Sequence, residues 1–275
     1  MNDIVVCIPN YNGADYLRKL VLQKDLDYVV VDNCSTDDSV AICEQRGIKV
    51  IKNMETLDRV HNWIRCLIWF KHSDYQWLKW LFVGDRLDDN AGDIMRRAVA
   101  SMDTASVVVF DYDVDYGDGD VRRWRSVPAG NVLTSEKMAI CLLRKENIFG
   151  SPIGIMIKKD EFVISQLQHE FVWAADYFLH YKLAEHGLTY FVGAKIGTFN
   201  AKSRKHFQRL YGQLNSLLEE LEILRIVYMR YPHVISEAEM MAIFIKKIMA
   251  IAIKISPSYT YLLKIYNRLL QRAVK

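Results

Sequence analysis

Several patterns that mark common classes of protein are missing from this 275-residue chain. Its five cysteines are scattered without C-x-x-C spacing, so neither a zinc site nor a disulfide framework is indicated. The seven histidines show no H-E-x-x-H spacing, and no Gly-x-x-x-x-Gly-Lys-Ser/Thr loop occurs, which argues against a kinase-like ATPase. The first residues have neither the basic region nor the apolar stretch of a secretory signal. We therefore expect the protein to remain in the reducing cytoplasm.

A strong charge of one sign is missing as well, because the net charge is only +3. Residues 236–275 nevertheless hold seven Lys and Arg against two Glu, a net charge of +5, which leaves −2 for the rest of the chain. A basic tail suits an anionic membrane face, whereas a nucleic-acid binder more often shows a basic stripe across its folded domain. We therefore expect no nucleic-acid partner, and we expect a cytoplasmic protein that can lie on the inner face of the cell membrane.

A regular alternation of strand and helix patterns is present in the first 111 residues. With 51% hydrophobic and 25% charged residues, the chain can bury a full core. The alternation predicts an α/β fold with a mostly parallel sheet flanked by helices. The expected strands are Ile4–Ile8, Tyr28–Val31, Lys49–Ile51, Trp77–Val83 and Ser106–Asp111, and the expected helices are 15–23, 39–45, 57–71 and 91–101.

The next segments continue this pattern. Asp111–Asp120 has acids at alternate positions like a calcium loop, but it lacks the glycine at the sixth position and the glutamate at the twelfth. A hairpin that turns at Gly117–Gly119 is therefore favoured. After it we expect helices near 135–143 and 173–186, and strands near 154–158, 189–191 and 195–199.

The last part of the chain is predicted to be helical from His206 onward, with breaks at Pro232 and Pro257. We therefore expect an α/β domain at residues 1–205 and a helical extension at 206–275. Ser236–Glu239 is a capping box for a helix that is too interrupted by lysine to span a bilayer.

One face of the final expected helix is basic and lies beside leucine and isoleucine side chains. This pattern suits a helix at a membrane interface, and it suits equally a helix packed on the first domain or on a second subunit. The basic residues are Lys264, Arg268 and Arg272.

Polar residues follow two of the expected strands directly. Ile4–Gly13 ends in Pro-Asn-Tyr-Asn-Gly, and Tyr28–Ser39 ends in Asp-Asn-Cys-Ser-Thr-Asp-Asp-Ser. In open α/β sheets, nucleotides bind in the crevice beyond the carboxyl ends of neighbouring strands. The two strand ends therefore predict a site of nucleotide size.

These segments also carry a family resemblance. Ile8-Pro-Asn-Tyr-Asn12 and Val31-Asp-Asn-Cys-Ser-Thr-Asp37 resemble the opening of family-2 glycosyltransferases of the GT-A fold, and later blocks at 62–67, 81–87 and 150–159 extend the likeness. The resemblance implies transfer of a sugar from a UDP- or dTDP-sugar to a saccharide acceptor, with inversion at the anomeric carbon. It also implies that the acceptor is linked to a lipid and that the reaction belongs to the assembly of bacterial surface polysaccharide of the O-antigen type. The rival interpretation is a noncatalytic subunit that binds nucleotide sugars or glycans.

The resemblance also assigns residues to the nucleotide-sugar site. It implies that Pro9, Tyr11 and Asn12 line the base pocket, and that Asp32 and Asn33 contact the base edge or the ribose. The family often has aspartate where this chain has Asn33, and an amide both donates and accepts, so the choice between uridine and thymidine stays open. The other expected contacts come from Arg59, Gly84, Asp85 and Arg86. Ser35–Asp37 are expected mainly to cap a helix.

The expected metal site departs from the family pattern. Asp85 matches the acidic motif that binds Mn²⁺ or Mg²⁺ in the family, but Arg86 stands where the second aspartate of that motif is usual. Asp88 and Asp89 follow closely and suit either substitute metal ligands or the start of a helix. Three alternatives follow. Asp85 holds a divalent metal, or Arg86 clamps the diphosphate, or Arg86 only pairs with a neighbouring acid and the chain binds without turnover. At an effective dielectric near 20, an ion pair at 4 Å is worth roughly 4 kcal/mol, about half of what a divalent ion supplies.

The resemblance implies a catalytic base as well. Asp176, at the start of an expected helix, matches the aspartate that deprotonates the acceptor hydroxyl, although Ala175 replaces the usual preceding glutamate. Trp173 is expected to stack on an acceptor sugar. His206 lies where the family often has a histidine near the diphosphate, and we expect it to contact the acceptor.

Overall fold

The structure, a computed structural model, describes residues 3–125, 130–145, 147–160, 164, 171–203 and 210–255. The chain forms two compact units, residues 1–135 with 149–203, and residues 136–148 with 204–275. The domain boundary expected from sequence differs from this division in one segment. Residues 136–148 precede the end of the α/β unit in sequence, yet they group with the C-terminal helices. Arg144 in this segment makes an ion pair with Glu239 of the helical part.

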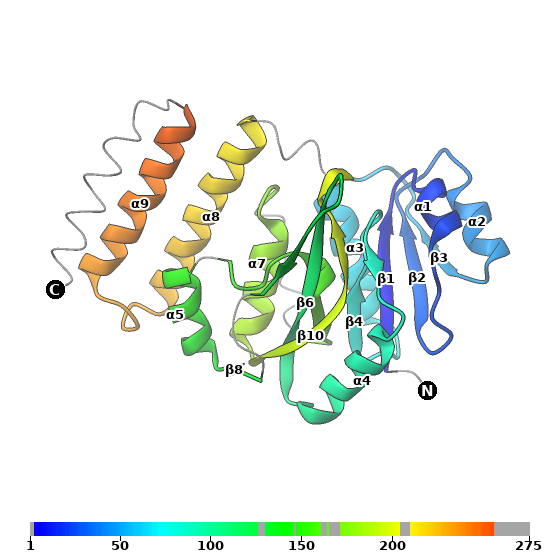
Figure 1. Cartoon of the computed structure of the whole chain (residues 1–275), viewed down its shortest axis with the longest axis horizontal. Helices are drawn as coiled ribbons and strands as arrows, with labels where there is room; N and C mark the ends of the chain where they lie inside the picture. The colour runs from blue at the N-terminus through cyan, green and yellow to red at the C-terminus, as the bar shows by residue number, and fades with distance from the viewer. Residues whose placement is uncertain are drawn as a thin grey trace. The chain divides into compact units, whose positions relative to one another are not determined.

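The first unit is built on a mixed sheet whose described strands run in the order β3-β2-β1-β4-β9-β6-β10-β5, with β7 beside β6 and β8 beside β10 (Figure 1). Four N-terminal strands are parallel: β1 Ile4–Asn10, β2 Asp27–Asp32, β3 Lys49–Lys52 and β4 Trp77–Trp80. The chain first adds strands on one side of β1 and then returns to place β4 on its other side, and this reversal leaves a crevice at the carboxyl ends of the strands.

The second half of the sheet reverses direction. β9 (Ile155–Lys158) lies antiparallel between β4 and β6 (Ala105–Gly117), and β10 (Leu188–Asn200) runs parallel to β6. Short strands β5 (Arg86–Leu87), β7 (Asp120–Trp124) and β8 (Val132–Leu133) pair antiparallel with this part of the sheet. The predicted hairpin at Gly117–Gly119 is confirmed as the turn between β6 and β7, and both glycines have positive φ.

One sequence prediction about β10 was wrong. Residues 189–191 and 195–199 were expected as two short strands, but they form one strand with register shifts against β6 between Val192 and Lys195 and between Lys195 and Thr198. The shifts interrupt the alternation of apolar and polar residues, so the sequence pattern shows a gap where the backbone pairing continues.

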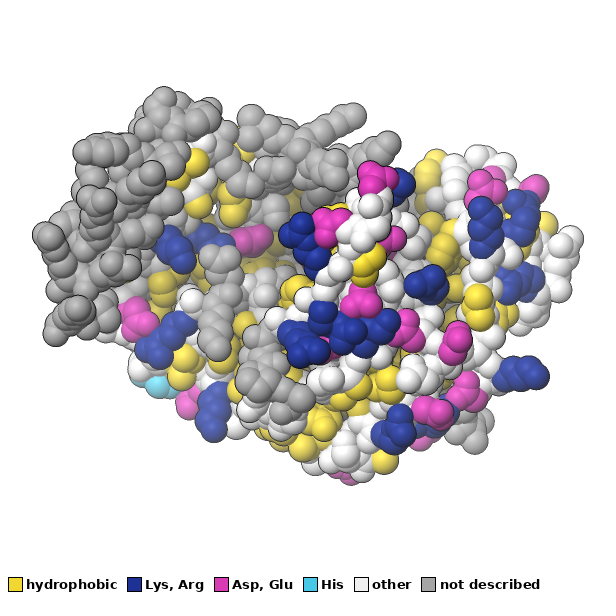
Figure 2. All heavy atoms as spheres, in the orientation of Figure 1, with side chains coloured by type: hydrophobic (Ala, Val, Ile, Leu, Met, Phe, Trp, Pro, Cys, Tyr) yellow, Lys and Arg dark blue, Asp and Glu magenta, His cyan; other side chains and the backbone are white. Residues whose placement is uncertain are grey.

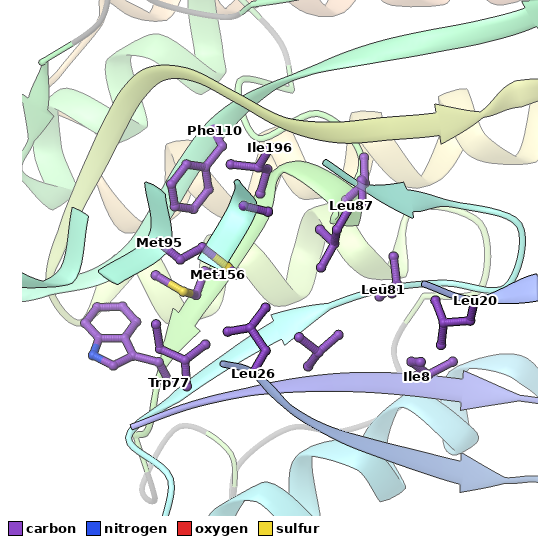
Figure 3. Close-up of a cluster of buried hydrophobic side chains, with 14 of the residues drawn as sticks. Ile8, Leu20, Leu26, Trp77, Leu81, Leu87, Met95, Phe110, Met156 and Ile196 are labelled. Carbon is purple, nitrogen blue, oxygen red and sulfur yellow. The ribbon is translucent and has the colours of Figure 1, made fainter. Parts of the chain in front are cut away.

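Helices cover both faces of the sheet in the first unit. α1 (Ala14–Lys19), α2 (Ser39–Gln45) and α4 (Ala91–Ser101) bury apolar side chains on one face against residues of β1, β4, β6 and β9. Figure 3 shows this core, in which Ile8 and Leu81 lie near the cleft end of the strands and Trp77 near the opposite end. α3 (Arg59–Lys71) contacts β1 and β2 through the other face, and α7 (Ala175–Glu185) contacts β6 and β10.

The second unit contains α5 (Ser135–Lys145), α8 (Leu210–Arg230) and α9 (Glu237–Ile255). Arg144 of α5 makes a two-point ion pair with Glu239, at 2.7 and 3.2 Å, and Lys247 contacts Glu220 at 2.9 Å. The backbone N–H of Glu239 donates to Ser236 Oγ at 3.1 Å, which confirms the predicted N-terminal cap of α9. Among the described helices, none has the length and apolarity needed to cross a membrane. Lys264, Arg268 and Arg272 lie outside the described residues.

Candidate active site

The loops that follow β1 and β2 are joined by a network of hydrogen bonds. Asp32, at the end of β2, accepts from Asn10 Nδ2 at 2.8 Å, from Ser35 Oγ at 2.6 Å and from the Ser35 N–H at 3.0 Å. Asn12 holds the other side, because its N–H donates to Ser35 Oγ at 2.9 Å and its Oδ1 accepts the Thr36 N–H at 2.8 Å. Asp32 is buried, and its two carboxylate oxygens are engaged inside this network. These residues fix the floor of the crevice.

Asn33 clamps the loop that follows β3. Its Nδ2 donates to the Leu57 carbonyl at 2.7 Å, while its Oδ1 accepts from the Leu57 N–H at 2.8 Å and from Asn53 Nδ2 at 3.0 Å. Asn53 also donates to Asn62 Oδ1 at 2.8 Å, so three buried amides form one chain of contacts. An aspartate at position 33 has no N–H to give to the Leu57 carbonyl. This geometry explains why an amide stands where the family often has a carboxylate.

A cleft of about 270 Å³ opens between these loops and the start of α3. Tyr11 lies at the rim of this cleft and is 54% exposed. Arg59, the first residue of α3, has its Cζ 5.2 Å from the centre of the Trp63 ring and donates to the Val172 carbonyl, which links one wall of the cleft to the segment just before α7. The lining residues are Pro9, Asn10, Tyr11, Asn33, Thr56, Leu57, Arg59, Asn62 and Trp63.

The cleft brings together four of the residues expected at the nucleotide: Pro9, Tyr11, Asn33 and Arg59. Asn12 and Asp32 do not line it and instead hold its loops in place. Asn62 and Trp63 belong to a block that the family resemblance already covers, although no role was assigned to them. Nothing in the local sequence singles out Thr56 and Leu57, because only the long-range contact with Asn33 places them here.

The expectation that Ser35–Asp37 cap a helix holds for one of the three residues. Asp37 accepts the N–H of Ala14 at 2.9 Å and of Ser39 at 3.0 Å, the first residues of α1 and α2. For Ser35 and Thr36 the prediction was wrong, because both bond to the loop after β1. Long-range partners across the two loops replace the local helix ends.

Asp85 lies beyond the end of β4, after a turn that Gly84 enters with φ of 101°. Its side chain is 1% exposed, and its Oδ1 accepts the N–H of Asn200 at 3.0 Å. The Tyr16 hydroxyl donates to the Asp85 carbonyl at 2.8 Å. The neighbouring Arg86 is exposed and pairs through its backbone with β10.

Asp176 lies in the first turn of α7, where its Oδ1 accepts the N–H of Tyr177 at 2.9 Å. Burial raises the pKa of the Tyr112 phenol, and the charges of Asp176 and Asp85 add to the rise. The two carboxylates therefore lie within electrostatic reach of one phenol, although one comes from α7 and the other from the end of β4. Trp173 is half-buried just before this helix, and His206 lies outside the described residues.

Two buried titratable groups, Lys79 and His180, were not singled out by the sequence analysis. Lys79 of β4 is fully buried, with its Nζ 2.6 Å from the carbonyl oxygens of Trp80 and Ile153. Burial lowers the pKa of Lys79 to about 7, opposed by the charge of Asp85. Burial and nearby Lys79 lower the pKa of His180 to about 3, and neither ring nitrogen of His180 has a hydrogen-bond partner among the described residues.

A mixed sheet with its order reversed beside β1, and a cleft beyond the carboxyl ends of β1 and β2, form a domain of the α/β class. The sequence model of "Glycosyl transferase family 2" matches residues 5–81 of this chain. That segment runs from β1 to the end of β4 and includes every residue that lines the cleft. No curated protein sequence gives a significant match.

Solved structures of low sequence identity share the fold. Residues 1–349 of S. aureus TarS in complex with UDP-GlcNAc align with a TM-score of 0.62 at 16% identity, covering 91% of this chain and 73% of TarS 1–349. Glucosyl-3-phosphoglycerate synthase from Mycobacterium tuberculosis, in complex with Mn²⁺, UDP and glucosyl-3-phosphoglycerate, aligns with a TM-score of 0.50 at 14% identity, covering 79% of each chain. The family model thus matches the first part of the α/β unit, and the solved structures share its GT-A fold.

Proposed function

We propose that this chain is an inverting glycosyltransferase that moves a sugar from a UDP- or dTDP-sugar to a saccharide acceptor. One observation carries the proposal. Arg59, which lines the cleft together with Tyr11, donates to the Val172 carbonyl just before α7, and the charges of Asp176 and Asp85 both act on the Tyr112 phenol. These contacts support a proposed order of base pocket, diphosphate position and proton acceptor along this edge of the sheet.

In this proposal the nucleotide base enters the cleft between Tyr11 and Arg59, where the exposed ring offers a stacking face. The diphosphate lies over Asp85 and Arg86. Asp176 takes the proton of the acceptor hydroxyl, whose oxygen forms a new bond at the anomeric carbon while the bond to the diphosphate breaks on the opposite side. The electron pair of that bond leaves with the nucleoside diphosphate. Inversion follows from this single displacement, and Trp173 and His206 remain proposed acceptor contacts.

The acceptor and the cellular setting are proposals as well. We take the acceptor to be lipid-linked and the process to be surface polysaccharide assembly of the O-antigen type, on the cytoplasmic side of the cell membrane, with residues 206–275 as a peripheral anchor. The family resemblance and the net charge of +5 in residues 236–275 support this. Sedimentation of the full chain with anionic but not neutral vesicles is expected. Equal sedimentation with both would contradict an electrostatic anchor.

The experiment that tests the proposed activity measures release of nucleoside diphosphate from a panel of UDP- and dTDP-sugars in the presence of saccharide acceptors. We expect release with at least one donor, and a product whose anomeric configuration is inverted by NMR. The rival interpretation, a subunit that binds nucleotide sugars without turnover, predicts binding but no release with any donor. A retained anomeric configuration would rule out the single displacement.

A further inference from the structure

The residues around Asp85 fit a divalent cation poorly. Hard cations such as Mg²⁺ and Mn²⁺ bind several oxygen ligands, usually carboxylates, waters and phosphates. Asp85 offers a carboxylate that is 1% exposed and that already accepts the Asn200 N–H at 3.0 Å. Across the described part of the chain, no group of three or more His, Cys, Asp or Glu side chains is placed to hold a metal ion.

Two carboxylates near Asp85 are already paired with cations. Lys195 Nζ lies 3.0 Å from Asp88 and 3.1 Å from Asp113, and Arg123 contacts Asp113 at 2.6 Å. Figure 2 shows the result as Lys and Arg side chains mixed with Asp and Glu over the region of β6 and β10. A divalent ion at Asp88 has to displace an ammonium group that bridges two acids. Asp88 is therefore a weak substitute ligand.

Arg86 stands where the second acid of the motif is expected, and its backbone is held firmly. β5 pairs with β10 through Arg86 and Thr198 and through Leu87 and Gly197. A Cβ added at Gly197 lies 2.3 Å from the Arg86 carbonyl oxygen, so the two backbones are in close contact. Leu87 points into the core, and Arg86, the residue before it, is exposed. Alternation along the strand therefore turns the guanidinium toward solvent.

Arg86 follows Asp85 directly, and its side chain is exposed. No carboxylate among the described residues pairs with it. The alternative in which Arg86 only neutralises Asp85 or Asp89 is therefore not seen in this structure. A planar guanidinium with five donors is well suited to two-point contact with a diphosphate.

We propose that Arg86 neutralises the leaving diphosphate in place of a divalent cation, so that sugar transfer proceeds without metal. This inference rests on the proposed function and adds the way in which its leaving group is stabilised. The new negative charge appears on the diphosphate oxygen as the anomeric bond breaks, and the fixed positive charge of Arg86 faces that oxygen.

The test compares the full chain with Arg86→Ala, Arg86→Lys and Arg86→Asp, and with Arg65→Asp as a matched control. Arg65 is an exposed arginine of α3 outside the cleft, so its substitution changes the net charge equally. Release of nucleoside diphosphate is measured with EDTA and with Mn²⁺. Binding of UDP, dTDP and the free nucleosides is measured by calorimetry with EDTA, and Mn²⁺ binding is measured by electron paramagnetic resonance.

We expect the unsubstituted chain to turn over equally with EDTA and with Mn²⁺. Arg86→Ala is expected to lower kcat/KM about 10²–10³-fold and to weaken nucleoside diphosphate binding without affecting the nucleoside, with Arg86→Lys in between. Arg86→Asp is expected to bind Mn²⁺ in the presence of the nucleotide, which the parent chain does not. Arg65→Asp is expected to behave like the parent.

Distinct results would overturn the inference and the proposed function. Loss of turnover on adding EDTA, restored by Mn²⁺, would contradict metal-free transfer while leaving the glycosyltransferase intact. So would unchanged diphosphate affinity in Arg86→Ala. If neither UDP nor dTDP binds the parent chain, the proposed function fails, and this inference fails with it.

Discussion

Replacement of Lys79 by methionine tests the interior of the site through the pH dependence of stability. The Lys79 amine is fully buried among the carbonyl oxygens of Trp80, Pro152, Ile153 and Ile155, at distances between 2.6 and 3.3 Å. Burial lowers its pKa from 10.5 to about 7 in the folded protein, with Asp85 opposing the shift. Between these two pKa values the unfolded chain holds a proton that the folded chain has lost. The stability contributed by Lys79 therefore rises with pH across this window.

The size of the effect follows from linkage. One pKa unit corresponds to about 1.4 kcal/mol. Integrating the difference in bound protons from pH 7 to pH 9 gives the unsubstituted chain a gain of about 2 kcal/mol relative to Lys79→Met. His180, which faces the same region, has its pKa lowered to about 3 and does not titrate in this range. Methionine has a similar length and no proton to exchange, so the variant lacks this contribution.

The assay is urea unfolding followed by circular dichroism at pH 7, 8 and 9, for the unsubstituted chain, for Lys79→Met and for the exposed-lysine control Lys24→Met. The unfolding free energy of the parent minus that of Lys79→Met is expected to rise steadily with pH, by about 2 kcal/mol from pH 7 to pH 9. The difference for the control is expected to stay constant. A constant difference for Lys79→Met would mean that the buried amine keeps its proton, and would refute this account of Lys79.

Three further substitutions test the loops and the base. Asp176→Asn is expected to lower kcat by about 10²–10⁴-fold with little change in nucleotide affinity, because general-base catalysis is lost while the cleft stays intact. A near-normal kcat in steady-state assays would show that Asp176 is not the general base. Asn33→Asp is expected to cost about 1–3 kcal/mol of stability in chemical denaturation and to weaken nucleoside diphosphate binding, because the Leu57 carbonyl loses its donor. Gly13→Ala places a Cβ 2.2 Å from Asn10 Oδ1, so we expect a loss of about 1–3 kcal/mol by the same measurement, and an unchanged midpoint would contradict the close packing.

The elements with strong local patterns could be predicted from the sequence. α2 and α4 have the expected boundaries, and β1 to β4 follow the expected alternation. The antiparallel insertion of β9 between β4 and β6 was not predicted, because strand order depends on contacts between distant segments. For the same reason the sequence did not reveal that residues 136–148 join the C-terminal helices.

The candidate site shows the same division between local and distant information. The motifs after β1 and β2 indicated where the cleft lies, but not which side chains form its wall and which hold its loops. Asp32 is expected to contact the nucleotide, and the long-range fold adds that it also accepts hydrogen bonds from Asn10 and Ser35. Lys79 reads as one polar residue in an apolar strand, and only the fold shows that the carbonyl groups around Pro152 surround it.

The most direct test of the central claim is a crystal structure of the chain with bound UDP or dTDP. We predict that the base lies in the cleft lined by Tyr11, Asn33 and Arg59, with the diphosphate beside Arg86 and with Asp176 facing the β-phosphate side. A nucleotide bound elsewhere, for example in the separate cavity of about 510 Å³ beside Trp69 and Tyr75, would contradict the account.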